Sequence, residues 1–183
     1  QGFGLGIDED SWPIRYFAQQ GMDILVAASY SKNFGLYGER LGSLSILSSN
    51  SQVAHNILSH LKRIARTNYS NPPIHGAKIM RSVMQDVGLK KLWVDELTSM
   101  RRRINEIRES LYRSLSSQYG KDSFRFLTSR KGMFAMLPLS KVQIDRLAAE
   151  YGVYVTGNGR LNLTGLNDDN LMYVLEALVK TQR

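Results

Sequence analysis

One lysine stands between two predicted strands, in a turn rich in serine and glycine. The apolar run 24–28 leads into this turn, and Leu44 and Ile46, which alternate with polar residues, lead out of it. Lys32 is therefore expected at the end of a buried strand, where desolvation disfavours a charged ammonium group. A neutral lysine amine is the nucleophile that forms Schiff bases with aldehydes.

Two neighbours of this lysine have the chemistry to bind a phosphate group. Ser29 is a neutral donor three residues before Lys32, and Arg40 is a bidentate cation eight residues after it. A phosphorylated aldehyde such as pyridoxal phosphate would use the amine, the hydroxyl and the guanidinium together. On residue types alone, the alternative is an ordinary surface lysine in a polar loop.

Residues 29–42 resemble the cofactor-lysine signature of the class I aminotransferases, which are fold type I pyridoxal-phosphate enzymes. Within that class the stretch is most similar to the aspartate and aromatic amino acid aminotransferases. The resemblance implies that Lys32 forms a Schiff base with pyridoxal 5'-phosphate and later acts as general base. It also implies that Ser29, Ser31 and Arg40 bind the cofactor, with Ser29 and Arg40 at its phosphate.

A second motif of the same family lies at residues 68–73, where two prolines end a predicted helix over 50–67. In the family, an arginine two residues before this Asn-Tyr-Ser segment binds the distal carboxylate of a dicarboxylic substrate, across the interface of a homodimer. The resemblance gives this role to Arg66. From charge alone, Arg66 would be an exposed arginine at the basic end of a helix.

A third motif follows a glycine turn near the C-terminus. Arg160 stands after Gly159, and arginine is a planar, permanently charged clamp for carboxylates. On bare sequence it could equally be a surface arginine. The resemblance implies that Arg160 binds the substrate α-carboxylate. It also places Phe134, after Gly132 and Met133, at the substrate, although packing is its first expected role.

The predicted secondary structure changes character along the chain. Helical periodicity covers 8–20, 50–67, 76–87 and 89–118, whereas short strands are predicted at 124–127, 133–137, 153–156 and 161–163. A capping-box sequence at 140–143 predicts a further helix to about 151, and a final amphipathic helix carries Leu171, Val174, Leu175 and Leu178. In the helix over 89–118, apolar residues should form one stripe, with arginine and glutamate on the other face.

These elements predict an α/β fold in two parts. By resemblance, residues 1–99 are the C-terminal part of a large cofactor-binding domain with an incomplete mixed sheet. Residues 100–183 are a small α+β domain joined to it by the long helix. In the family, a Tyr directly before the first residues and an Asp further upstream touch the cofactor, so we expect the C-terminal part of a longer enzyme.

The amino-acid composition limits the classes of protein to which this chain could belong. The 183 residues are 43% apolar and 22% charged, which is ordinary for a globular protein. No apolar run reaches the length of a membrane span, and no cysteine is present for a disulfide or thiolate metal site, so we expect a cytoplasmic protein without membrane contact. The net charge of +8 is dispersed, which suits anionic substrates better than nucleic acid.

No metal site is expected from the histidines. His55 and His60 are five residues apart, so they do not share a helix face, and His75 stands alone after the proline pair. We interpret all three as structural residues.

The resemblance implies transamination of aspartate or aromatic amino acids with 2-oxoglutarate, so the partners are amino acids and 2-oxo acids. Two alternatives remain open at this point. The chain could be a catalytically incompetent fragment that lacks the other half of the site. It could also serve another fold type I reaction, such as decarboxylation or elimination. The preference between aspartate and aromatic substrates is also open.

Overall fold

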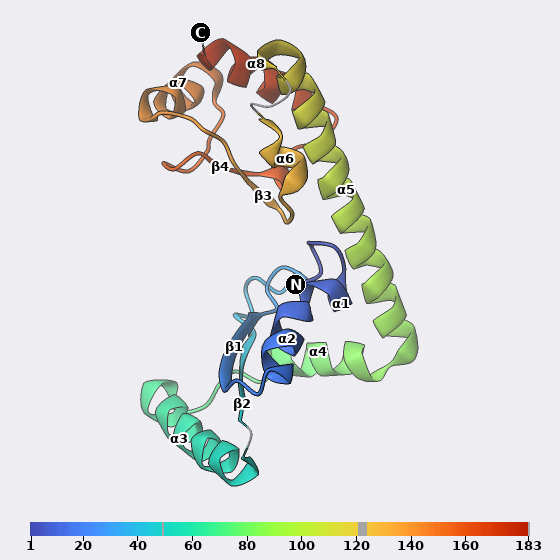
Figure 1. Ribbon diagram of the computed structural model, residues 1–183, viewed down its shortest axis with the longest axis vertical. Helices are drawn as coiled ribbons and strands as arrows, with labels where there is room; N and C mark the ends of the chain where they lie inside the picture. The colour runs from blue at the N-terminus through green and yellow to red at the C-terminus, as the bar shows by residue number, and fades with distance from the viewer. Residues whose placement is uncertain (49, 121–123, 183) are drawn as a thin grey trace. The chain divides into compact units, whose positions relative to one another are not determined.

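The computed structural model describes residues 1–48, 50–120 and 124–182 (Figure 1). The chain divides into two compact units, Gln1–Thr98 and Ser99–Arg183. The boundary falls inside helix α5 (Val87–Tyr119), which therefore contributes residues to both units. Among the described residues, each unit has one two-stranded antiparallel sheet.

The first unit contains short helices around one hairpin. Its elements are α1 (Ile7–Asp10), α2 (Trp12–Gln19), β1 (Ile24–Ser29), β2 (Gly42–Leu47), α3 (Ser51–Tyr69), α4 (His75–Gln85) and the start of α5. The helix predicted over 8–20 is divided at Ser11 into α1 and α2. Pro13 lies in the first turn of α2, where the missing N–H group needs no helical partner.

Strands β1 and β2 confirm the predicted strand–turn–strand unit but not its burial. The two strands pair in register from Ile24↔Leu47 to Ser29↔Gly42, so the described sheet is antiparallel rather than mixed. No residue of either strand is buried, and the side chain of Leu25 is 71% exposed. Helix α2 contacts β1, but no described element buries the remaining surface of the hairpin.

Helix α3 begins directly after its N-cap residue, Asn50. The Asn50 side chain accepts hydrogen bonds from the backbone N–H groups of Gln52 at 2.9 Å and Val53 at 3.1 Å. The helix ends at Tyr69, two residues beyond the predicted end, because Ser70 turns into the left-handed region with φ 65°. No residue of α3 is buried, although its apolar positions recur on one face.

In its described residues, the second unit packs helices around a short hairpin. Its elements are α6 (Phe126–Ser129), β3 (Phe134–Met136), α7 (Lys141–Tyr151), β4 (Arg160–Asn162), the 3₁₀ turn η2 (Leu163–Gly165), α8 (Leu171–Gln182) and the rest of α5. The core side chains come from α5, α6, α7, η2 and α8, and include Ile104, Leu111, Leu115, Leu127, Leu147, Leu163 and Leu178. The predicted apolar stripe of α5 is buried here, except for Met100, which is 41% exposed.

Several sequence predictions for the second unit are wrong. The segment 124–127 is not a strand, because the N–H groups of Thr128 and Ser129 both bond the Arg125 carbonyl and form helix α6. Residues 153–156 do not form a paired strand. The expectation that every arginine of α5 lies on a polar face also fails at Arg108, which is 2% exposed.

The helix starts that depend on local chemistry are confirmed. Ser140 accepts a hydrogen bond from the Gln143 N–H at 3.3 Å, and the Gln143 side chain accepts one from the Ser140 N–H at 2.8 Å. This reciprocal capping box opens α7 at the predicted residue. Within the described ranges, none of the helices has the length and apolar character needed to cross a membrane.

Candidate active site

The predicted cofactor lysine lies in the loop that connects β1 to β2. The loop is closed at its base by a 3.0 Å hydrogen bond from the Tyr30 N–H to the Leu41 carbonyl. Inside it, a tight turn is held by a 3.2 Å bond from the Gly35 N–H to the Lys32 carbonyl, with Gly35 at φ 65°. Because Arg40 is adjacent to Leu41, closure of the loop brings Arg40 back to the strand end that carries the lysine turn.

The two serines of the motif meet at the end of β1. The Ser29 hydroxyl donates to the Ser31 hydroxyl at 3.3 Å and accepts from the Ser31 N–H at 3.4 Å. Ser31 is 5% exposed, whereas Lys32 is partly buried. The structure thus places two hydroxyls and a primary amine within four consecutive residues, at one end of the hairpin.

Arg40 has an uncommon backbone conformation and an exposed side chain. Its φ of 51° lies in the left-handed region, which costs a non-glycine residue about 1 kcal/mol or more. Its guanidinium donates to the Tyr37 carbonyl at 3.1 Å and makes no ion pair with any residue of the described ranges. Most of its donors therefore remain available to an anion.

These donors fit a phosphorylated aldehyde. An amine can form a covalent bond with the aldehyde carbon, while hydroxyls and a guanidinium are ordinary ligands of phosphate. The four sequence-predicted cofactor residues, Ser29, Ser31, Lys32 and Arg40, all belong to the strand end and the loop it opens. The described contacts join Ser29 to Ser31, while the Arg40 guanidinium bonds the Tyr37 carbonyl, so the cofactor-binding role of the four residues stays a prediction.

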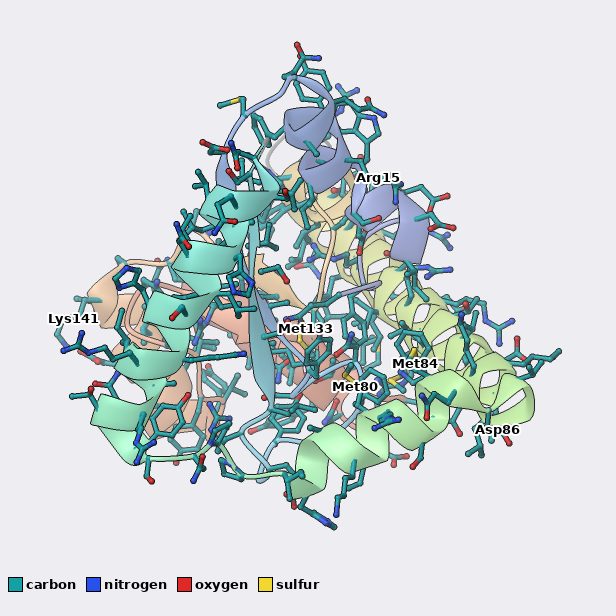
Figure 2. All side chains as sticks on the ribbon, turned by 90° about the horizontal axis from the view of Figure 1, so that it is seen from below. Arg15, Met80, Met84, Asp86, Met133 and Lys141 are labelled. Carbon is teal, nitrogen blue, oxygen red and sulfur yellow. The ribbon has the colours of Figure 1, made fainter. Side chains whose placement is uncertain are left out.

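A pocket of about 430 Å³ lies beside the lysine turn, in the first unit. It is lined by Ser29, Asn33, Phe34 and Trp93, and by apolar side chains that include Met80 and Met84 of α4, labelled in Figure 2. Lys32 and Arg40 are not among its lining residues. The pocket therefore shares Ser29 with the predicted cofactor site and lies beside its lysine and arginine.

Asp10 is the carboxylate at the rim of this pocket. It accepts hydrogen bonds from the backbone N–H groups of Gly4 and Leu5, both at 2.9 Å. Burial alone would raise the pKa of Asp10, but the N–H groups of Gly4, Leu5 and Gly6 outweigh it and lower that pKa. Asp10 thus ties the first loop to α1 as an ionised carboxylate.

Trp93 is a residue near the site that the sequence analysis missed. Its indole N–H donates to the Asn33 carbonyl at 2.6 Å, and its ring stacks on Phe34 with centroids 4.9 Å apart. A signal for its position was available, because Trp93 stands one helical turn before Leu97 and so extends the apolar stripe of α5.

Arg66 lies on the last turn of α3, and its side chain is exposed. Its carbonyl accepts a 3.0 Å hydrogen bond from Ser70, which ends the helix. The guanidinium has no hydrogen-bond or ion-pair partner among residues 1–48, 50–120 and 124–182. No described contact joins Arg66 to the lysine turn, so the structure does not bring these two predicted site residues together.

Arg160 and Phe134 meet on the hairpin of the second unit. In the β3–β4 register, Phe134 pairs with Asn162 and Met136 with Arg160, so Phe134 and Arg160 are diagonal neighbours on one face. The Arg160 guanidinium carbon lies 4.9 Å from the centroid of the Phe134 ring. The Arg160 side chain is exposed and available to a carboxylate.

The buried Arg108 of α5 stabilises the start of this hairpin through hydrogen bonds to backbone carbonyls. The Arg108 guanidinium donates to the carbonyls of Leu127 at 3.0 Å and Gly132 at 2.7 Å, and also to the carbonyl of Phe134. Burial without a carboxylate lowers the pKa of the Arg108 guanidinium. Arg108 therefore fixes the start of β3, and with it the ring on which Arg160 lies.

A metal site was not predicted, and the described ranges contain no group of three or more His, Cys, Asp or Glu side chains that could hold an ion. The donors at the site are instead an amine, hydroxyls and arginines. This set suits covalent chemistry and the binding of anions.

Comparisons with known proteins identify the family of this chain. The family model described as "Aminotransferase class I and II" matches residues 1–178. The aspartate aminotransferase of Pseudomonas aeruginosa is 42% identical over 180 residues, which are 98% of this chain and 45% of that protein. The aromatic-amino-acid aminotransferase of Escherichia coli is 42% identical over 177 residues, with 97% of this chain and 45% of that protein covered.

Solved structures give the same result at the level of the fold. The aromatic-amino-acid aminotransferase of Burkholderia pseudomallei, solved covalently bound to pyridoxal phosphate, has a TM-score of 0.94 and 40% sequence identity. The match covers 100% of this chain and 46% of that one, so the chain spans less than half the length of these relatives. The α/β fold and the match over nearly the whole chain show that it belongs to the class I and II aminotransferases.

Proposed function

We propose that this chain is the cofactor-lysine segment of a pyridoxal 5'-phosphate-dependent aminotransferase. The whole enzyme would transfer the amino group of aspartate or an aromatic amino acid to 2-oxoglutarate. The observation that carries this proposal is the closed loop 30–41, which contains Lys32, Ser31 and Arg40 and follows directly on Ser29 at the end of β1. The pyridoxal phosphate held by the Burkholderia relative supports the choice of cofactor.

Each residue of the loop has a distinct task in this proposal. Lys32 would hold the cofactor covalently through its amine, and as a free amine it would act on the α-proton of the substrate as general base and then as general acid. The hydroxyls of Ser29 and Ser31 and the Arg40 guanidinium hold the cofactor, with Ser29 and Arg40 at its phosphate. When bound, pyridoxal phosphate supplies the electron sink for this proton transfer.

Two arginines outside the loop would bind the substrate. Arg160 binds the α-carboxylate, and its exposed guanidinium lies over Phe134, which lines the site. Arg66 binds the distal carboxylate of a dicarboxylic substrate in the neighbouring site of a homodimer. This assignment agrees with the absence of any contact that joins Arg66 to the lysine turn of its own described chain.

The two-part organisation belongs to the same proposal. Residues 1–99 would be part of the large cofactor-binding domain and residues 100–183 the small domain, joined by the long helix α5. The units observed, Gln1–Thr98 and Ser99–Arg183, support this division. A cytoplasmic location also belongs to the proposal, and fractionation of cells that express the protein would test it.

A second candidate is that the 183-residue chain by itself binds the cofactor poorly and does not turn over. Two observations favour it: the chain covers 45% of its curated relative, and the β1–β2 hairpin has no buried residue. In this case the transamination belongs to a longer polypeptide that contains the segment.

One spectroscopic experiment tests both candidates. Pyridoxal phosphate is added to the 183-residue chain, and the absorption band of lysine-bound cofactor is recorded before and after addition of aspartate. A band that bleaches with aspartate supports a working site, while a band that persists with aspartate supports binding without turnover. If no band forms in the chain or in a polypeptide of the relatives' full length that contains it, the assignment of Lys32 is wrong.

A further inference from the structure

We infer that Trp93 is a positioning residue for the cofactor lysine: its indole holds the two residues that directly follow Lys32 and thereby sets the direction of the lysine side chain. The inference rests on the proposed function in one respect, namely that Lys32 carries the cofactor. The contacts themselves stand independently of that function.

The first contact is a hydrogen bond to the backbone of the turn. The Trp93 N–H donates to the Asn33 carbonyl at 2.6 Å, from a position 60 residues further along the chain. Indole has one donor and no acceptor, so this bond uses the whole hydrogen-bonding capacity of the side chain. The bond holds the peptide group that joins Asn33 to Phe34.

The second contact is aromatic stacking on the next residue. The rings of Trp93 and Phe34 are 4.9 Å apart at their centroids, and their planes differ by 19°. One side chain of α5 therefore contacts both Asn33 and Phe34. A turn held by one contact could still rotate about that contact. The hydrogen bond and the ring stack together prevent this rotation.

The turn has weak internal support, so an external restraint has a large effect. Its own backbone bonds are long: 3.3 Å from the Phe34 N–H to the Tyr30 carbonyl, and 3.2 Å from the Gly35 N–H to the Lys32 carbonyl. Gly35 also adds conformational freedom at the exit of the turn. The 2.6 Å bond from Trp93 is shorter than both of these backbone bonds.

Helix α5 gives Trp93 a rigid base. Leu97, one turn further along the same face, is fully buried at 0% exposure, and the helix runs without a break over 33 residues. A lysine amine sits on a flexible four-carbon stem, so the direction of its Cα–Cβ bond decides where the nitrogen can reach. Because Trp93 is fixed on α5, its two contacts restrict the orientation of the Lys32 Cα–Cβ bond.

The test compares Trp93→Phe with Trp12→Phe in the 183-residue chain. Trp93→Phe removes the N–H donor and keeps an aromatic ring that can stack on Phe34. Trp12 is 58% exposed and stacks on Tyr16, outside the lysine loop, so Trp12→Phe is a matched control. A third variant, Phe34→Leu, removes the stacking partner and leaves the N–H bond.

The first readout is hydrogen–deuterium exchange, which needs no cofactor. We expect amides 33–35 to exchange about 3- to 10-fold faster in Trp93→Phe, in line with the loss of one hydrogen bond. The β1–β2 ladder, amides 24–29, should exchange at its original rate in all variants. Unchanged exchange at 33–35 in both Trp93→Phe and Phe34→Leu would overturn the inference. Faster exchange across the whole first unit would overturn it too, because Trp93 would then be a general packing residue.

The second readout is covalent attachment of pyridoxal phosphate, trapped by borohydride and mapped by mass spectrometry. Labelling of Lys32 relative to exposed Lys78 should fall about 3- to 10-fold in Trp93→Phe and stay constant in Trp12→Phe. If wild-type Lys32 is not labelled above Lys78 in this chain or in a polypeptide of the relatives' full length that contains it, the proposed function fails, while hydrogen exchange still decides the role of Trp93. If wild-type Lys32 is labelled and Trp93→Phe is labelled equally, the function stands and the positioning role is refuted.

Discussion

The guanidinium of Arg160 lies over the ring of Phe134, with 4.9 Å between the guanidinium carbon and the ring centroid. The ring is itself fixed, because the carbonyl of Phe134 accepts a hydrogen bond from buried Arg108. The proposed carboxylate-binding Arg160 therefore packs on a residue whose backbone is bonded to the core of the second unit. Substitutions in the residues that support the hairpin should therefore alter the position of Arg160 without changing Arg160 itself.

Gly159→Ala should destabilise the hairpin that carries Arg160. Gly159 has φ 77°, and a Cβ atom there would lie 2.3 Å from the Leu137 carbonyl oxygen. We expect a loss of about 2–4 kcal/mol in the free energy of unfolding, measured by urea denaturation. Gly157→Ala is the control, since its Cβ meets nothing within 4 Å, and should change stability by about 0.5 kcal/mol or less. Equal effects of the two variants would contradict this explanation.

Arg108→Lys should cost about 3 kcal/mol of stability even though the charge is kept. Lysine lacks the planar fork that reaches the carbonyls of Leu127, Gly132 and Phe134 together, so buried acceptors lose their donors. Arg102→Lys is the matched control on the same helix, because the side chain of Arg102 is 76% exposed. Chemical denaturation followed by circular dichroism measures both, and a stable Arg108→Lys variant would show that the fork is dispensable.

Lys32→Ala should abolish covalent attachment of pyridoxal phosphate. In an enzyme of the relatives' full length that contains this segment, transamination should also fall by at least about 100-fold, because the general base is lost. The mass of the borohydride-treated protein and a keto-acid assay measure the two effects. Lys78→Ala, which removes an exposed lysine of the same unit, should change neither. Near-normal turnover of Lys32→Ala would refute the role of Lys32.

Arg66→Leu should selectively lower the catalytic efficiency with dicarboxylic substrates. A charge-assisted hydrogen bond to the distal carboxylate is worth about 1.5–3 kcal/mol, so kcat/KM for aspartate should fall roughly 10- to 100-fold. An aromatic amino acid lacks that carboxylate and should change by less than about threefold. Steady-state assays of the full-length enzyme compare the two substrates, with Arg63→Leu on the same helix as control. An unchanged ratio of the two kcat/KM values would rule out this role for Arg66.

Asp10→Asn should remove a pH-dependent part of the stability. The folded state lowers the pKa of Asp10 from its ordinary value of 3.8, because backbone N–H groups outweigh the effect of burial. Its contribution is therefore complete above pH 3.8 and is lost as the pH falls through the folded-state pKa.

Denaturation of wild type and Asp10→Asn at neutral and acidic pH measures this contribution. The difference in unfolding free energy should be largest at neutral pH, at about 1–2 kcal/mol, and should shrink in acid. Asp8→Asn is the control, because the Asp8 side chain is 91% exposed and should show little difference at any pH. A difference for Asp10→Asn that is constant with pH would mean that its charge does not contribute.

Local chemistry was predictable where the cause lies within a few residues. The capping box at Ser140 and Gln143 and the apolar stripe of α5 depend on neighbours about one helical turn apart, and the structure confirms both, with Met100 as the exposed member of the stripe. The group formed by Ser29, Ser31, Lys32 and Arg40 was predictable for the same reason, since one short loop carries it. The roles assigned to these residues remain predictions.

Long-range packing decided what the sequence pattern left open. Residues 124–127 alternate like a strand but form part of a helical turn, and Arg108 looks like a surface residue but is buried by carbonyls from 19 to 26 positions away. Trp93 was overlooked because its partner Asn33 lies 60 residues earlier.

The sequence by itself determined the helix caps, the hairpin and the set of chemical groups in the lysine loop, because each depends on contacts between close neighbours. Only the tertiary structure decided that Arg160 lies on Phe134 and that an indole from α5 holds the lysine turn. These features join segments far apart in the chain, and periodicity carries no information about which distant segment will meet which.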